Sequence, residues 1–158
     1  MRTETGSTVG GRGSAAPIVV GIDGSESSNA AFEWAVKQAR LTNVPLVAIA
    51  AWEWPTNYGT PLVWPEEIDF EADARAMLER TVDQILGVEH RTEVTQQVIH
   101  GHPAPILEEQ SRSASLVVVG CRGHGEFAGM LLGSVSEFLS THAHCPVVIV
   151  RGDKVRID

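Results

Sequence analysis

Short apolar runs alternate with segments of helical spacing along most of the chain, and this alternation limits the fold more than any other feature. Five of the runs predict strands, at residues 17–22, 45–52, 92–99, 115–120 and 146–150. Apolar spacing and helix-start signals predict the helices between them, at about residues 28–41, 66–86, 103–112 and 134–143. No hairpin signal joins two strands. The pattern therefore predicts an α/β fold, a doubly wound sheet of five parallel strands with helices on both faces.

Length and composition indicate one domain with two short tails. The chain has 158 residues, of which 43% are hydrophobic and 20% are charged, as in ordinary globular proteins. Residues 1–16 are rich in glycine and hydroxyl side chains and lack the apolar core of a secretory signal, so they predict a disordered tail. We expect the domain to occupy residues 17–152 and a second tail to occupy residues 153–158.

Charge, hydropathy and cysteine content disfavour several classes of protein. The net charge of -8 opposes nucleic-acid binding, and the longest apolar run, residues 44–52, is too short to span a membrane. Two cysteines are too few for a disulfide framework and indicate a cytoplasmic protein. Cys121 follows the fourth strand and Cys145 precedes the fifth, so a parallel sheet places them at opposite ends, where they cannot pair.

The loop after the fourth predicted strand carries five glycines within residues 120–134. Carboxyl ends of parallel strands meet at one edge of a sheet, where such folds bind ligands. We expect Gly120 and Gly123 to adopt conformations closed to other residues, and Gly133-Ser134 to present unpaired N–H donors at a helix N-terminus. The loop therefore predicts a polyphosphate site. Alternatively, the Ser134 side chain forms a capping box with Glu137.

The spacing Gly120-x2-Gly123-x9-Gly133-Ser134 resembles the ATP-binding signature G-2x-G-9x-G(S/T) of the universal stress protein family. Three other features support the resemblance: Asp23 closing the first strand, Gly101-x-Pro103 after the third, and the run at residues 142–150. The similarity extends from about residue 17 to residue 152.

The resemblance implies a site for ATP, with Mg²⁺ expected beside it. Asp23 would contact the ribose, and the adenine wall would include Ile22 and Ala51. The ribose and phosphate path would be lined by Gly120, Arg122 and Gly123. The phosphates would meet a helix N-terminus formed by Gly133, Ser134, Val135 and Ser136. A turn residue that bonds the backbone near Ser25 is the alternative interpretation of Asp23.

The resemblance also implies a stress-response binding module rather than an enzyme, and a homodimer formed through the last strand, by Val147, Val148, Ile149 and Val150. Two alternatives stay open. One is a slow ATPase or a phosphoryl or nucleotidyl transferase, although no spacing assigns a catalytic role to Arg122, His124 or Glu126. The other is a dimeric interaction protein without a ligand.

Two further groups of residues have ambiguous patterns. His142, His144 and Cys145 could suggest a metal site, but they belong to the opposite end of the sheet from the glycine loop. The segment at residues 53–65 contains three prolines, which make regular structure improbable there, and aromatic side chains cluster in or beside it. These aromatics either pack the loop onto the domain or form a lid or a surface for a partner.

Overall fold

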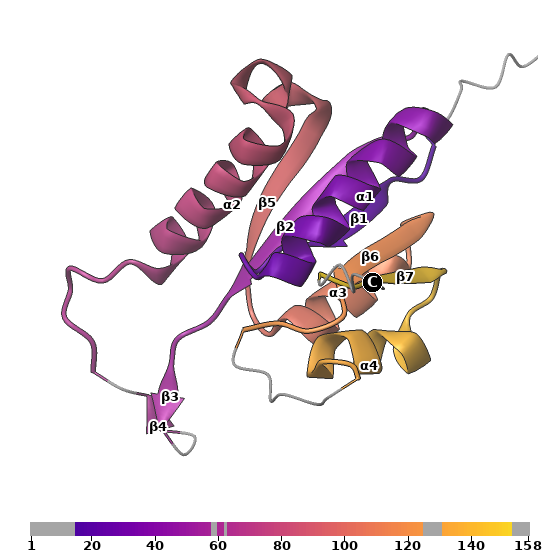
Figure 1. Cartoon of the computed structure of the whole chain (residues 1–158). Helices are drawn as coiled ribbons and strands as arrows, with labels where there is room; N and C mark the ends of the chain where they lie inside the picture. Colours follow the sequence, from indigo (N-terminus) through magenta and orange to yellow (C-terminus); the bar gives the residue numbers. More distant parts are fainter. Residues whose placement is uncertain (1–14, 58–59, 62, 125–130, 153–158) are drawn as a thin grey trace, which may run out of the picture.

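Five parallel strands form one sheet in the computed structural model, in the order β5-β2-β1-β6-β7 (Figure 1). The model describes residues 15–57, 60–61, 63–124 and 131–152. The strands are β1 (Ile18–Gly21), β2 (Leu46–Trp52), β5 (Val94–His100), β6 (Leu116–Gly120) and β7 (Val147–Val150). The predicted doubly wound sheet is confirmed, and the half-buried strand β5 lies at one edge.

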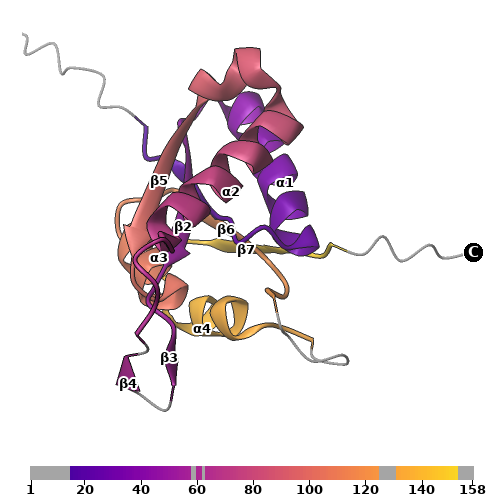
Figure 2. The same ribbon diagram turned by 90° about the vertical axis from the view of Figure 1, so that its left-hand side faces the viewer.

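Helices cover both faces of this sheet, as Figures 1 and 2 show. One face carries α1 (Glu26–Thr42) and α2 (Phe70–Leu86), and the other carries α3 (Pro103–Ser111) and α4 (Ser134–His142). The larger core, between the sheet and α1 and α2, is built around Phe32, Leu78 and Val82. The smaller core packs Leu107 of α3 and Leu139 of α4 against the opposite face.

The helices α1, α2 and α3 each begin after a residue whose side chain caps them, and the first two caps fix where the helices on one face start. Ser25 accepts a hydrogen bond from the Ser28 amide at 3.3 Å and begins α1. Asp69 accepts one from the Ala72 amide at 3.0 Å and begins α2. The expected start of α2 near residue 66 is therefore wrong, because this cap and a turn that follows Pro65 delay the helix.

The segment between β2 and α2 contains regular structure that the sequence analysis did not expect. The short strands β3 (Thr56–Asn57) and β4 (Thr60–Pro61) form an antiparallel pair. Each contributes only two residues, too few to leave an alternating pattern, and the proline lies in an edge strand, where it is tolerated. A 3-10 helix, η1 (Val88–Glu93), also precedes β5 and was not predicted.

Three further expectations concern the cysteines, membrane-spanning helices and the two tails. Cys121 and Cys145 do not pair with each other, as predicted from their positions in the sheet. Cys121 is buried and Cys145 is partly exposed. Within the described ranges, no helix has the length and apolar character needed to cross a membrane. The expected C-terminal tail and residues 1–14 of the expected N-terminal tail lie outside the described residues.

The larger core predicts a strong dependence of stability on Phe32, which is completely buried in α1. Phe32→Ala should lower the free energy of unfolding by about 3–5 kcal/mol, because it removes apolar contacts and leaves a cavity. The matched control is Leu41→Ala on the same helix, where the side chain is 82% exposed, and its effect should stay within about 0.5 kcal/mol. Denaturant unfolding of the three proteins measures both values, and equal effects would contradict the assignment of the core.

Candidate functional site

A cavity opens at the carboxyl ends of β1, β2 and β6, between the sheet and the helices α3 and α4. The chain runs outward from β1 through β2 to β5 and then crosses to β6 on the other side. The direction of winding therefore reverses between β1 and β6. Such a switch point leaves a crevice beyond the strand ends, where doubly wound proteins bind their ligands.

All ten residues predicted to contact a nucleotide belong to the described part of the chain, and nine line this cavity. Those nine are Ile22, Asp23, Ala51, Gly120, Arg122, Gly123, Gly133, Val135 and Ser136. They come from four separate segments, which the strand order brings to one edge of the sheet. Ser134, expected to be the main side-chain donor, is not among the lining residues.

The two oxygens of Asp23 have different surroundings. Oδ1 accepts a hydrogen bond from the Ser25 amide at 2.9 Å, so the turn contact weighed as an alternative is present. Oδ2 lies opposite Gly123, 2.7 Å from the position that a Cβ on this glycine would occupy. One carboxylate thus both closes the β1–α1 turn and contributes to the wall of the cavity.

Close packing rather than unusual backbone angles explains Gly120 and Gly123. Among the described glycines only Gly24, Gly87 and Gly101 have positive φ, so the expectation of special conformations at Gly120 and Gly123 is wrong. A Cβ on Gly120 would lie 2.7 Å from the backbone of α1. Gly120 is therefore required for the contact of β6 with α1, while Gly123 leaves space for the Asp23 carboxylate.

The N-terminus of α4 differs from the expectation in two ways. Its N-cap is Gly133 and no side chain caps it, so the alternative capping box between Ser134 and Glu137 does not form. The Gly133 amide donates to the Cys121 carbonyl at 2.6 Å and is not an unpaired donor. Val135 and Ser136 both line the cavity and lie in the first turn of α4, where the amides have no carbonyl of their own helix to bind.

One wall of the cavity was not predicted from the sequence. This wall is formed by α3, through Pro103, Ile106 and Leu107, and it meets floor residues Ile49 and Val119 from the sheet. The spacing i, i+3, i+4 along α3 is the signal that could have identified the wall. The cavity therefore combines an apolar interior with polar groups at Asp23 and at the start of α4.

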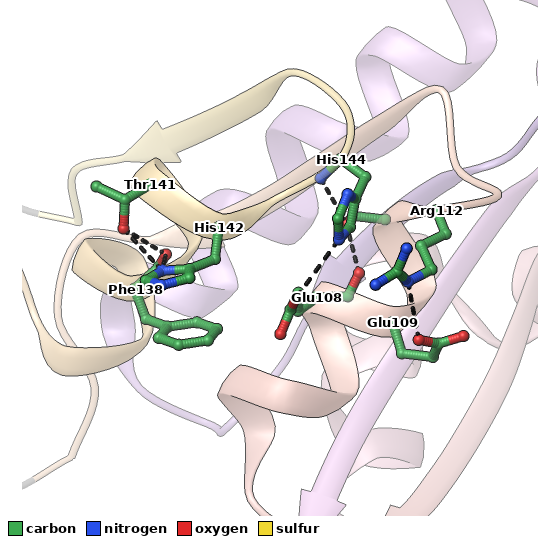
Figure 3. Close-up of polar contacts among 8 residues, drawn as sticks. Glu108, Glu109, Arg112, Phe138, Thr141, His142 and His144 are labelled. Carbon is green, nitrogen blue, oxygen red and sulfur yellow. Dashed lines mark hydrogen bonds and ion pairs between the residues drawn. The ribbon is translucent and has the colours of Figure 1, made fainter.

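The histidines considered for a metal site make other contacts, shown in Figure 3. The His142 ring stacks on Phe138 with centroids 4.1 Å apart, and His144 Nε2 lies 3.4 Å from Glu108 Oε1. Partial burial raises the pKa of the Cys145 thiol, which disfavours the thiolate that a metal would need. Over the described ranges, no group of three His, Cys, Asp or Glu residues is arranged to hold a metal ion.

The aromatic residues near β2 pack against one another. Trp52 contacts Trp54 at a centroid distance of 5.6 Å and His100 at 4.6 Å. Trp54 and Trp64 both lie edge-on to Phe70 at the start of α2, at 5.6 and 5.4 Å. These contacts agree with the interpretation that the aromatics pack the connecting segment onto the domain. None of these aromatic residues lines the cavity described above.

The different surroundings of two glycines predict different effects on stability. Gly120→Ala should lower the free energy of unfolding by about 1–3 kcal/mol, because the new methyl group would press on the α1 backbone. Gly123→Ala should cost less, because within the described residues its methyl group would meet the Asp23 side chain alone, which can rotate away. Denaturant unfolding compares them, and a larger loss for Gly123→Ala would contradict this account.

Comparisons with known proteins identify the family and agree with the fold. The model of the Universal stress protein family matches residues 15–151. Universal stress protein Rv2623 of Mycobacterium tuberculosis is 37% identical over 146 residues, which are 86% of this chain and 45% of the relative. Universal stress protein Rv1996 of the same organism is 36% identical over 151 residues, 84% of this chain and 47% of the relative. The chain thus spans about half the length of these relatives.

Solved structures show the same architecture. A universal stress protein in complex with cAMP superposes with a TM-score of 0.65 and 28% identity, over 89% of this chain and 100% of that chain. The universal stress protein from Archaeoglobus fulgidus in complex with dAMP has a TM-score of 0.62 and 21% identity, over 87% and 98% of the two chains. At the lower identity the likeness concerns the fold alone. From the family match over residues 15–151, we conclude that this chain belongs to the universal stress protein family.

Proposed function

We propose that the cavity at the ends of β1, β2 and β6 binds ATP, and that the protein is a cytoplasmic stress-response module regulated by this nucleotide. The observation that carries the proposal is the convergence of nine predicted contact residues on one cavity at the switch point of the sheet. The similar protein that binds cAMP, at 28% identity, supports an adenine nucleotide as the ligand class. The intact glycine signature favours ATP within this class.

The chemistry of the walls agrees with a nucleotide in one orientation. The apolar interior between Ala51 and Ile106 is suited to an adenine ring, which gains by leaving water. Asp23 lines the cavity, and its Oδ2 would accept hydrogen bonds from ribose hydroxyl groups at the edge of this interior. Val135 and Ser136 lie in the first turn of α4. The dipole of a helix favours negative charge at its N-terminus, so the phosphates would extend toward α4.

The remaining predicted residues extend this path. Gly120, Arg122 and Gly123 would lie along the ribose and phosphates, and the Ser134 hydroxyl would reach the phosphates from outside the cavity lining. Mg²⁺ would accompany the phosphates. We propose a binding module rather than an enzyme, because the walls present no group assigned to orient an attacking water. His124 is exposed and Glu126 lies outside the described residues.

Calorimetric titration with Mg-ATP tests the proposal with two aspartates that make the same kind of contact. Asp23 and Asp69 each accept an amide hydrogen bond near the start of a helix, at 2.9 and 3.0 Å, but only Asp23 lines the cavity. We expect one site per chain. Asp23→Asn should weaken ATP binding about tenfold, through loss of charge-assisted hydrogen bonds to ribose. Asp69→Asn should bind ATP like the original protein.

Two results would reject the proposal. One is the absence of saturable binding by the folded original protein, and the other is an equal effect of the two substitutions. Multiple turnover of ATP in the same samples would instead favour the alternative function, an enzyme that acts as a slow ATPase or as a phosphoryl or nucleotidyl transferase.

We also propose a homodimer formed through β7, the edge strand opposite β5. All four of its residues, Val147, Val148, Ile149 and Val150, are only partly buried in the single chain. The Pro146 carbonyl accepts a hydrogen bond from the Val117 amide in β6 at 3.0 Å, and the Val150 carbonyl accepts one from the Cys121 amide just after β6 at 2.8 Å. Backbone groups of alternate residues point to the same side of a parallel strand, so Val147 and Ile149 direct theirs to the open edge.

Proline substitutions at the two edges of the sheet test the dimer. Val147→Pro removes a donor from the open edge of β7 and should convert the dimer to monomer. Gln96→Pro is the matched control on β5, because the Gly101 amide bonds the Trp52 carbonyl and Gln96 therefore faces the other open edge. Sedimentation at micromolar concentration measures the state of each protein. A monomeric original protein, or a dimer that survives Val147→Pro, would contradict the interface.

A further inference from the structure

We infer that Ser27 is a positioning residue for the nucleotide site: from α1, its hydroxyl holds the backbone of Arg122 at the start of the glycine loop. The inference rests on the proposed ATP site. Ser27 is absent from the family signature quoted above, and its side chain does not line the cavity. Its effect on a ligand would therefore pass through the loop.

The Ser27 hydroxyl contacts both backbone polar groups of Arg122. Its Oγ donates to the Arg122 carbonyl oxygen in a short hydrogen bond, and it accepts from the Arg122 amide at 3.4 Å. Ser25 Oγ adds a longer contact to the same carbonyl at 3.5 Å. Ser27 is 7% exposed and Ser25 is 9% exposed, so these bonds are largely shielded from competing water.

Close packing places Ser27 where these bonds can form. A Cβ on Gly120 would lie 2.7 Å from the Ser27 carbonyl carbon, and a Cβ on Gly152 would lie 2.7 Å from the Ser27 amide nitrogen. The first turn of α1 therefore rests on two glycines, one at the end of β6 and one just beyond β7. A side chain at either glycine would move Ser27 away from Arg122.

The residue before Arg122 is held from the other face of the sheet. The Cys121 carbonyl accepts hydrogen bonds from the Gly133 amide at 2.6 Å and from Ser136 Oγ at 3.0 Å, both at the start of α4. Its amide donates to Val150 at 2.8 Å. Cys121 is thus held by α4 and β7, and Arg122 by α1. These two residues carry the chain from the sheet into the loop, so the Ser27 contact sets the direction in which the loop leaves β6.

A loop held in one conformation before binding loses less conformational entropy when a ligand arrives. Arg122 and Gly123 line the cavity on the path proposed for the ribose and phosphates. The hydrogen bonds of the Ser27 hydroxyl within the described residues go to Arg122 and not to the adenine wall at Ile22 and Ala51. Loss of this hydroxyl should therefore weaken binding of ATP, which would extend along the whole path, more than binding of the nucleoside, which has no phosphates.

The test compares ATP and adenosine binding to Ser27→Ala by calorimetry. ATP affinity should fall about five- to tenfold, and adenosine affinity should change less than about twofold. Ser140→Ala is the matched control, since Ser140 Oγ also bonds a backbone carbonyl, that of Glu137 at 2.6 Å, on an exposed part of α4. This control should bind both ligands like the original protein.

Hydrogen exchange supplies a measurement that needs no ligand. The Arg122 amide should exchange faster in Ser27→Ala than in the original protein, while amides in the centre of β6 should keep their protection. If Ser27→Ala does not fold, Ser27→Cys replaces it, because a thiol of similar size is a weaker hydrogen-bonding group.

Three outcomes would overturn the inference. Unchanged ATP binding by the folded variant would refute the role of Ser27 and leave the nucleotide site intact. Equal losses for ATP and adenosine would indicate a general structural defect. Failure of the original protein to bind either ligand would refute the proposed function itself, and the inference with it.

Discussion

The pairing of β1 with both β2 and β6 is the constraint on which the rest of the structure depends. It places β1 at the centre of the sheet and forces the chain to wind first toward β5 and then toward β7. The strand ends Ile22, Ala51 and Gly120 become neighbours only because of this order, and the cavity lies among them. Helices on both faces follow, because a parallel sheet buried on both sides must be covered by its own crossover connections.

The first turn of α1 packs closely against the ends of two strands beside the cavity. Gly120 and Gly152 allow the α1 backbone to approach the ends of β6 and β7. Hydroxyl groups in the first turns of α1 and α4 then reach the backbone at Arg122 and Cys121. The mouth of the cavity is therefore built from short-range contacts among three elements, while its interior is shaped by ordinary apolar packing from α3.

This chain is shorter than the family members it matches, and its strand β7 lies at an edge of the sheet. The chain corresponds to about half the length of the Mycobacterium tuberculosis relatives it matches. In this chain β7 presents the backbone groups of Val147 and Ile149 along an open edge, and an unpaired apolar edge is a liability that proteins usually cover. Pairing with a second copy would give these backbone groups hydrogen-bond partners. The cavity lies elsewhere, at the carboxyl ends of β1, β2 and β6.

The sequence by itself determined the element order, the parallel sheet and the edge at which the candidate site lies. These features follow from the periodicity of apolar residues, which a single sequence shows, and from rules of chain connection that hold for all such folds. It also identified nine of the residues that line the cavity, because the family signature and the strand ends mark them. Short elements such as the β3–β4 pair left no periodic signal.

Only the tertiary structure decided what individual groups do at that edge. Gly120 accommodates the α1 backbone, the Gly133 amide bonds Cys121, and Ser27 holds Arg122, across sequence separations that no local pattern encodes. The wall from α3 was likewise missed, since its apolar residues serve equally well as core or as cavity lining. Such roles depend on which atoms meet after the sheet has assembled, and distances between remote segments are fixed by packing rather than by spacing along the chain.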